Sequence, residues 1–158
     1  RLRKLARIEG LEHLQQAQAA GQGVILMAVH FTTLEIGATL LGQMHTIDGM
    51  YREHDNPLFD YIQRHSRERN AATVTATSKF AKLGKALVVP FTQLRLADGS
   101  GYKLLIHPPL ENFPGDSEEA DCLRINQWIE SVVSANPEQY LWAHRRFKTR
   151  PVGEAKLY

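Results

Sequence analysis

The longest apolar run of the chain extends from Val24 to Leu41, and its pattern changes at His30. Residues 24–29 are continuously apolar, which is typical of a short strand that is buried on both faces of a parallel sheet. Apolar residues then recur at helical spacing after Thr32 and Thr33, either of which can cap a helix. This run therefore predicts a strand, a short polar turn and a helix.

The rest of the chain alternates between helical and strand patterns. Predicted helices span Leu5–Ala20, Pro57–Arg69, Thr77–Leu83 and Asp116–Ser134, and predicted strands span Thr46–Tyr51, Ala86–Phe91, Thr92–Leu96 and Tyr102–Ile106. The turn sequence DGSG at residues 98–101 predicts a hairpin between the last two strands. In the last helix we expect four side chains to point inward, namely Leu123, Ile125, Ile129 and Val133.

Strands that alternate with helices indicate an α/β fold with a mostly parallel central sheet flanked by helices. The chain has 158 residues, of which 43% are hydrophobic, so we expect residues 1–158 to form a single domain with one core. Cys122 is the only cysteine, which excludes an intramolecular disulfide. We expect it to be a small buried core residue rather than a nucleophile.

His30 and Glu35 are the polar residues that most need an explanation within the apolar run. In open α/β sheets, ligands bind beyond the carboxyl ends of the strands, which is where His30 falls. Because His30 precedes the helix, Glu35 in the first helical turn can reach back to the ring. A carboxylate there would fix the imidazole tautomer and stabilise the imidazolium, which makes His30 a candidate general base. Alternatively, His30 is a structural histidine and Glu35 only favours the helix dipole.

Arginines in two places suit an anionic ligand. Arg52 can hold a phosphate through the two parallel N–H bonds of its guanidinium, or it can pair with a neighbouring carboxylate on the surface. Arg67 belongs to a basic cluster on a predicted helix, with Arg64 and Arg69. Such a cluster is either a solvated face or a binding site for an anionic lipid headgroup or an acidic protein.

The string HRRFKTR, at residues 144–150, concentrates cations beside Trp142 and Phe147. Three interpretations compete: nucleic acid, an anionic membrane surface or acidic carrier, and an ordinary structural tail. The net charge of the whole chain is only +2, and exposed aromatic residues for base stacking are few, so we expect no nucleic-acid partner. Aromatic rings beside Lys and Arg suit a membrane interface better. The scattered histidines match no metal-ligand spacing, so we expect no metal site.

Four segments, in this order, give the chain a family resemblance: GQGVILMAVHFTTLEIGA, MYREHDNPLFDYIQ, GYKLLIHPPLENFP and PEQYLWAHRRFKTRPVGE. They resemble the late acyltransferases of lipid A biosynthesis, the lauroyl and myristoyl transferase group. This group is part of the lysophospholipid and glycerol-phosphate acyltransferase superfamily, whose His-x-x-x-x-Glu signature matches His30 and Glu35. The resemblance covers residues from about Ile8 to Tyr158.

The resemblance implies a glycerol-phosphate-acyltransferase-like fold and an acyltransferase activity. The donor would be an acyl carrier protein thioester, and the acceptor a hydroxyl of a Kdo-bearing lipid A precursor. His30 would act as the general base oriented by Glu35, with Arg52 and Arg67 as substrate-binding residues and no metal or other cofactor. The expected setting is a membrane surface, the cytoplasmic face of a Gram-negative inner membrane. A glycerol-phosphate or lysophosphatidate type acyltransferase, or a non-catalytic lipid-binding module, is the alternative.

Two departures from the family pattern stand out. Members normally begin with a hydrophobic membrane-anchoring helix, and we expect this chain to start after it. In the family, several tens of residues also follow the segment that matches RHSRERN, whereas here Asn70 runs directly into Ala71. We therefore expect an internal segment to be missing between Asn70 and Ala71.

Overall fold

The computed structural model describes residues 2–47 and 77–143 of the chain. In these ranges the strands β1 (Ala6–Glu9), β2 (Val24–Ala28), β3 (Leu87–Arg95) and β4 (Tyr102–Ile106) form one sheet in the order β1-β4-β3-β2. β1 pairs with β4 in parallel and β2 pairs with β3 in parallel, while β3 and β4 are antiparallel. The predicted α/β fold with a mostly parallel sheet is confirmed.

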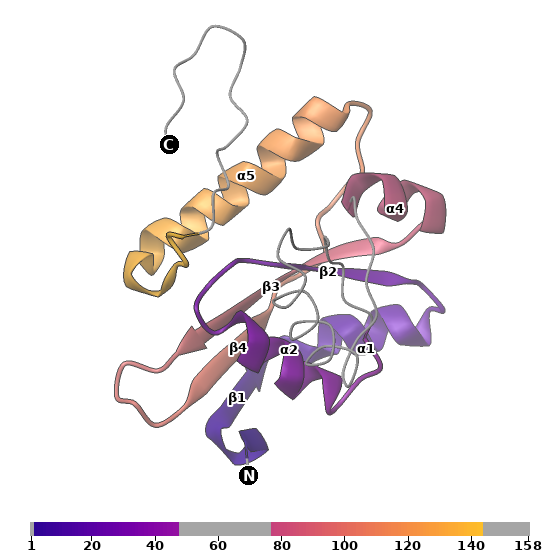
Figure 1. The fold of residues 1–158 in the computed structure, drawn as a ribbon. Coiled ribbons are helices and arrows are strands. Elements are labelled where there is room, and N and C mark those ends of the chain that lie inside the picture. Colours follow the sequence, from indigo (N-terminus) through magenta and orange to yellow (C-terminus); the bar gives the residue numbers. More distant parts are fainter. Residues whose placement is uncertain (1, 48–76, 144–158) are drawn as a thin grey trace, which may run out of the picture.

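Helices cover both faces of this sheet (Figure 1). One face packs against α1 (Leu11–Ala19) and α2 (Leu34–Gly42), in a core formed by Leu14, Leu40, Leu41, Val89, Phe91, Leu104 and Ile106. The other face packs against α4 (Thr77–Gly84) and α5 (Glu118–Ala135), around Met27, Val29, Phe31, Ala81, Val88, Ile129 and Tyr140. Alternate residues of β3 thus point into different cores, as the period of a strand requires.

The hairpin predicted at residues 98–101 is confirmed, but the strand before it differs from the prediction. Phe91 is paired with Ile106 and Arg95 with Tyr102, and the Asp98 carboxylate accepts hydrogen bonds from the backbone and side chain of Ser100. The two predicted strands before the turn are a single strand, β3. Pro90 does not interrupt β3, because its carbonyl still accepts a hydrogen bond of 2.9 Å from the backbone amide of His107.

The helix predicted from Leu5 to Ala20 is wrong in its first part. Residues 2–5 form a short 3-10 helix, η1 (Leu2–Leu5), and the next residues form β1. Pairing with β4 overrides the helical spacing there, because a strand added to a sheet edge satisfies its backbone through residues distant in sequence. Gly10 then turns the chain into α1 with φ of 78°, and a Cβ at this position would collide with the carbonyl of Ile106.

The last helix begins at Glu118, with the Ser117 hydroxyl accepting a hydrogen bond of 3.3 Å from the amide of Ala120. Ile129 is buried, as predicted, and Ile125 and Val133 pack against the same core. Two predictions were wrong, since the side chain of Leu123 is 57% exposed and Cys122 is exposed. Leu123 lies two positions before Ile125, and residues at that spacing do not share a helix face.

Several predicted elements lie wholly or partly outside the described residues. These are the helix Pro57–Arg69 and residues 48–51 of the predicted strand Thr46–Tyr51. Thr46 and Ile47 are described, and they are not in a strand. Over residues 2–47 and 77–143, no helix combines the length and apolar character needed to cross a bilayer.

Candidate active site

His30 lies in a loop between the carboxyl end of β2 and the start of α2, as predicted. Its neighbours Val29 and Phe31 are each only 1% exposed, whereas His30 itself is half-buried. Glu35 is exposed and lies in the first turn of α2. Both residues are therefore at the edge of the sheet where α/β proteins bind ligands. Their action as a catalytic pair stays a prediction.

Both ends of the loop at residues 29–33 are bonded to one residue of the neighbouring strand β3. The side-chain Nε2 of Gln93 donates a hydrogen bond of 2.6 Å to the carbonyl of Val29. At the other end, the Thr33 hydroxyl donates a hydrogen bond of 2.6 Å to the carbonyl of Gln93. Thr33, Gln93 and Val29 are each 1% exposed. Solvent therefore does not compete for these bonds, and the loop that carries His30 is fixed to the sheet.

Thr33 occupies the N-cap position of α2, one of the two candidates that the sequence offered. Its hydroxyl forms no capping hydrogen bond, because it is directed to Gln93 instead. Gly37 in the same helix lies directly over Gln93, and a Cβ at Gly37 would be 2.8 Å from the Cβ of Gln93. The glycine therefore allows α2 to approach β3 closely, with Thr33 above the Gln93 carbonyl.

The segment at residues 139–141 fixes the middle of the same loop from the other side. The amide of Leu141 donates to the carbonyl of His30, and the amide of Thr32 donates to the carbonyl of Gln139, each at 2.9 Å. Between them, Phe31 and Tyr140 form an isolated β-bridge, and their rings meet edge to face with centroids 6.4 Å apart. The backbone of His30 is thus held from both sides.

Gln93 is a functional candidate that the sequence analysis missed. Its Oε1 is buried and has no hydrogen-bond partner in the described part of the structure. A buried acceptor without a partner typically destabilises a fold by about 1–3 kcal/mol. Stability alone therefore does not explain a glutamine here. The available signal was a single amide inside the apolar run LVVPFTQL of residues 87–94.

The predicted substrate-binding arginines, Arg52 and Arg67, lie outside the described residues, as do Arg64 and Arg69. The basic string at residues 144–150 lies outside them as well. Trp142, next to that string, is described and is 68% exposed, so it is not a core residue. Its ring packs edge to face on Tyr140, with centroids 5.1 Å apart.

His107 is on the opposite face of the sheet from Gln93. Its Nε2 is 3.2 Å from the hydroxyl of Thr92, and its ring meets Trp128 edge to face at 5.2 Å. Burial lowers the pKa of His107, and the charge of His13 lowers it further. His107 therefore belongs to the packing between β3 and α5 and not to the loop of His30.

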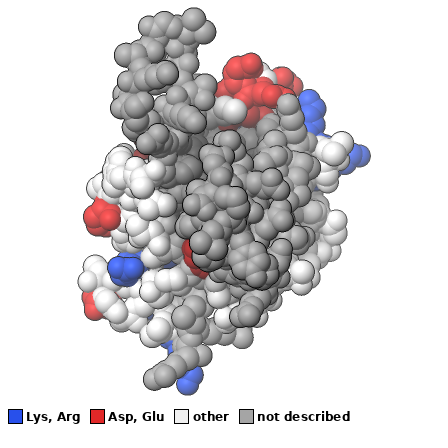
Figure 2. All heavy atoms as spheres, viewed as in Figure 1, with Lys and Arg blue, Asp and Glu red and all other residues white. Residues whose placement is uncertain are grey.

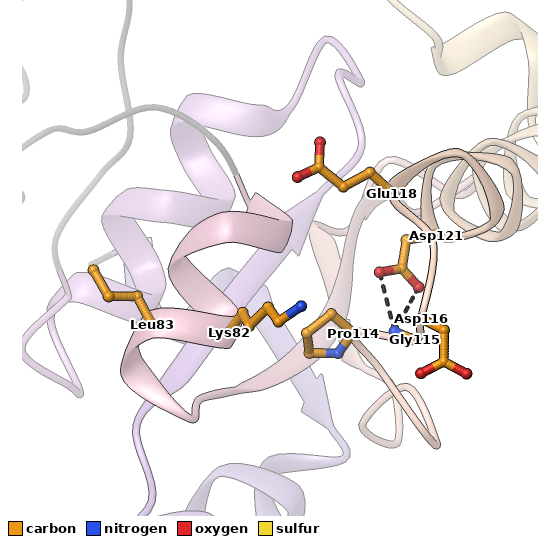
Figure 3. A pocket seen from close by; sticks show the side chains of 7 residues that line it. All are labelled: Lys82, Leu83, Pro114, Gly115, Asp116, Glu118 and Asp121. Carbon is orange, nitrogen blue, oxygen red and sulfur yellow. Dashed lines mark hydrogen bonds between the residues drawn. The ribbon is translucent and has the colours of Figure 1, made fainter.

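A hollow of about 370 Å³ lies between α4 and the start of α5 (Figure 3). It is lined by Lys82, Leu83, Pro114, Gly115, Asp116, Glu118 and Asp121, none of which comes from the loop at residues 29–33. Asp121 is only 2% exposed, and its two carboxylate oxygens accept bonds of 2.9 and 3.1 Å from the amide of Gly115. This carboxylate joins the preceding loop to α5, so its role is structural.

Acidic side chains gather where α5 begins, at the upper edge of the face in Figure 2. Glu118 and Glu119 are exposed in the first turn of this helix. The hydroxyl of Ser117 donates a bond of 2.8 Å to Glu119 and lowers the pKa of its carboxyl. Carboxylates at this end of a helix favour its dipole.

The amino-acid sequence is similar to one family of known proteins. The family model of bacterial lipid A biosynthesis acyltransferases matches residues 1–76 and 68–149. Over 204 aligned residues, the chain is 33% identical to the lipid A biosynthesis palmitoleoyltransferase of Escherichia coli (strain K12), with 100% of this chain and 66% of that protein covered. It is 32% identical to the lipid A biosynthesis lauroyltransferase of the same strain, with 100% and 67% covered.

A more distant relative is the lipid A biosynthesis myristoyltransferase of Escherichia coli (strain K12), at 24% identity, with 95% of this chain and 61% of that protein covered. The chain thus spans 66% of the length of the palmitoleoyltransferase. The two matches to the family model overlap at residues 68–76, around Asn70 and Ala71. The segment expected to be missing between these two residues stays a prediction.

Proposed function

The chain belongs to the bacterial lipid A biosynthesis acyltransferase family, and on this basis we propose that it transfers a fatty acyl chain from an acyl carrier protein to a lipid A precursor. The acceptor in this proposal is a hydroxyl of a Kdo-bearing precursor. The observation that carries the proposal is the position of His30, at the carboxyl end of β2 in a loop that is bonded on both sides.

In the proposed reaction, His30 accepts the proton of the acceptor hydroxyl while the hydroxyl oxygen attacks the thioester carbonyl carbon. A carbon–oxygen bond forms, the carbon–sulfur bond breaks, and the carrier thiolate leaves and takes the proton from the imidazolium. General-base assistance of this kind contributes about 10²–10⁴-fold. It is needed at the hydroxyl, which is almost fully protonated at neutral pH, and less at sulfur, because a thiolate is a good leaving group.

Glu35 orients the imidazole and stabilises the imidazolium in this proposal. Support comes from its place in the first turn of α2, a helix that begins at Leu34, four residues after His30. Glu35 is exposed in that turn, at the same edge of the sheet as the half-buried imidazole. A carboxylate in a first turn also favours the helix dipole. Glu35→Gln removes the charge from both roles, so a loss of turnover reports the first role and a loss of unfolding free energy reports the second.

The proposed partners are the acyl carrier protein, the lipid A precursor and a membrane surface, the cytoplasmic face of the inner membrane. Arg52 and Arg67 are proposed to hold phosphate groups of the substrate. The exposed indole of Trp142, beside the basic string at residues 144–150, is the described feature that supports contact with a lipid interface. The reaction as proposed uses no metal and no other cofactor.

An acceptor assay tests this function. The purified full chain is incubated with lauroyl, myristoyl or palmitoleoyl acyl carrier protein and a Kdo-bearing lipid A precursor, and the same donors are offered with lysophosphatidate or glycerol phosphate. We expect transfer to the lipid A precursor. Transfer only to lysophosphatidate or glycerol phosphate would assign the chain to the other branch of the superfamily. Binding of the precursor without turnover would indicate a lipid-binding module.

A further inference from the structure

We propose that Gln93 and Thr33 are positioning residues for acyl transfer: together they hold the loop at residues 29–33 so that the His30 imidazole faces the acceptor hydroxyl. The inference rests on the proposed role of His30 as general base. Neither residue would contact the substrate, because both are 1% exposed.

The geometry of the loop carries this proposal. Gln93 acts at both ends of the loop, through its Nε2 to the carbonyl of Val29 and through its own carbonyl from the Thr33 hydroxyl, each at 2.6 Å. His30 lies one residue after Val29, which accepts the first bond, and three residues before Thr33, which donates the second. Loss of either hydrogen bond lets that end of the loop move, and a shift of about 1 Å at a reacting group can lower a rate by about 100-fold.

Each of the two side chains lacks one ordinary hydrogen bond in the described part of the structure. Thr33 stands at the N-cap of α2, where a threonine hydroxyl usually accepts from the first helical turn, but it donates to Gln93 instead. Gln93 buries an Oε1 that has no partner among the described residues. A methionine would fill a similar volume without such an atom, so the amide at this position is best explained by the bond that it makes to the loop.

Thr92 provides a matched control next to Gln93 in the same strand. It is equally buried, at 2% exposure, but its hydroxyl lies on the opposite face of β3, 3.2 Å from Nε2 of His107. Thr92→Val therefore removes a buried hydroxyl from β3 but neither of the two hydrogen bonds between Gln93 and the loop of His30. Thr33→Val removes the bond from the Thr33 hydroxyl to the Gln93 carbonyl, and Gln93→Met removes the bond to the Val29 carbonyl. Thr33→Ser keeps the hydroxyl.

Steady-state kinetics on the full chain separate positioning from general stability. We expect kcat to fall by about 10- to 100-fold in Thr33→Val and Gln93→Met, with KM for the lipid A precursor changed by less than about threefold. Thr92→Val should keep the kcat of the unmodified chain, and Thr33→Ser should recover most of it. Unchanged kcat in Thr33→Val and Gln93→Met, or an equal loss in Thr92→Val, would overturn the proposal.

A second readout does not depend on turnover. The imidazole signals of His30 in NMR spectra are identified by their disappearance in His30→Ala. Thr33→Val and Gln93→Met should shift these signals and their titration midpoint, and Thr92→Val should leave them in place. If the unmodified chain transfers no acyl group, the proposed function fails, and the NMR comparison alone then decides the positioning. Identical His30 signals in all the variants would overturn it.

Discussion

The amide of Leu141 donates a hydrogen bond of 2.9 Å to the carbonyl of His30 and so joins a segment near the end of the described chain to the candidate general base. The residue before it, Tyr140, has φ of −70° and ψ of 140°, a conformation that a following proline accepts. Substitution at position 141 can therefore remove this donor without forcing Tyr140 into a new conformation.

Leu141→Pro removes the donor, and Leu141→Ala keeps it. We expect Leu141→Pro to lose at least about 1 kcal/mol of unfolding free energy, because the hydrogen bond is lost and the proline ring takes the place of the amide hydrogen against the His30 carbonyl, and to reduce acyl transfer by at least about tenfold. Leu141→Ala should stay near the unmodified rate, because this side chain is 41% exposed. Rate measurements and urea titrations of the two variants check this. Equal rates in both would show that the bond does not contribute to the site.

Gly37→Ala tests the close approach of α2 to β3. Alanine is favoured over glycine in a helix by about 1 kcal/mol, but the added Cβ would lie 2.8 Å from the Cβ of Gln93 and 3.2 Å from Cζ of Phe91. Overpacking of a core typically destabilises by about 1–3 kcal/mol, so we expect a net loss of stability in denaturant titrations.

The control for this prediction is Gly84→Ala at the end of α4. Among the described residues, a Cβ there would meet only the Cβ of Ala86, at 3.9 Å, which is an ordinary contact. We expect a change within about 0.5 kcal/mol. If Gly37→Ala were as stable as Gly84→Ala, the close contact between α2 and Gln93 would not exist in solution.

The lowered pKa of His107 predicts a pH dependence of stability. The folded state binds the proton less readily than the unfolded state, whose histidine pKa is about 6.5. The free energy of unfolding should therefore fall as the pH drops below about 6.5, and this loss continues until the pH passes the lowered folded-state pKa. Above about pH 6.5 the contribution of His107 is fully present.

His107→Gln removes this titration and keeps a neutral polar side chain. We expect unfolding free energies at pH 7.5 and pH 5.5 to differ less in the variant than in the unmodified chain. Other groups that titrate in this range contribute to both proteins, so the difference between the two changes isolates His107. Equal changes in both proteins would mean that the pKa of His107 is not lowered by folding.

The sequence predicts the parts of the fold that local signals define. The apolar run before His30, the polar turn and the helix after it are all present, and the turn at residues 98–101 closes a hairpin. The strand β1 was missed because its partner, β4, lies far along the chain. The predicted inward position of Leu123 failed because the core-facing stripe of α5 passes through Ile125 and Ile129 instead.

The candidate site, like the fold, is predicted from the sequence only where local signals define it. His30 and Glu35 stand out from the sequence because they interrupt an apolar run. The hydrogen bonds that hold their loop cannot be seen in the sequence, because Thr33 and Gln93 are 60 residues apart and Leu141 is further still from His30. A hydrogen bond between distant residues leaves no spacing pattern, so only a three-dimensional structure brings these residues together.

In the proposed function, the imidazole of His30 removes the proton of the acceptor hydroxyl. The most direct measurement compares single-turnover acyl transfer by the full chain and by His30→Ala, at saturating donor and lipid A precursor and with matched unfolding midpoints. We expect a rate that is lower by about 10²–10⁴-fold in the variant. A His30→Ala protein that transfers the acyl chain at the unmodified rate would contradict it.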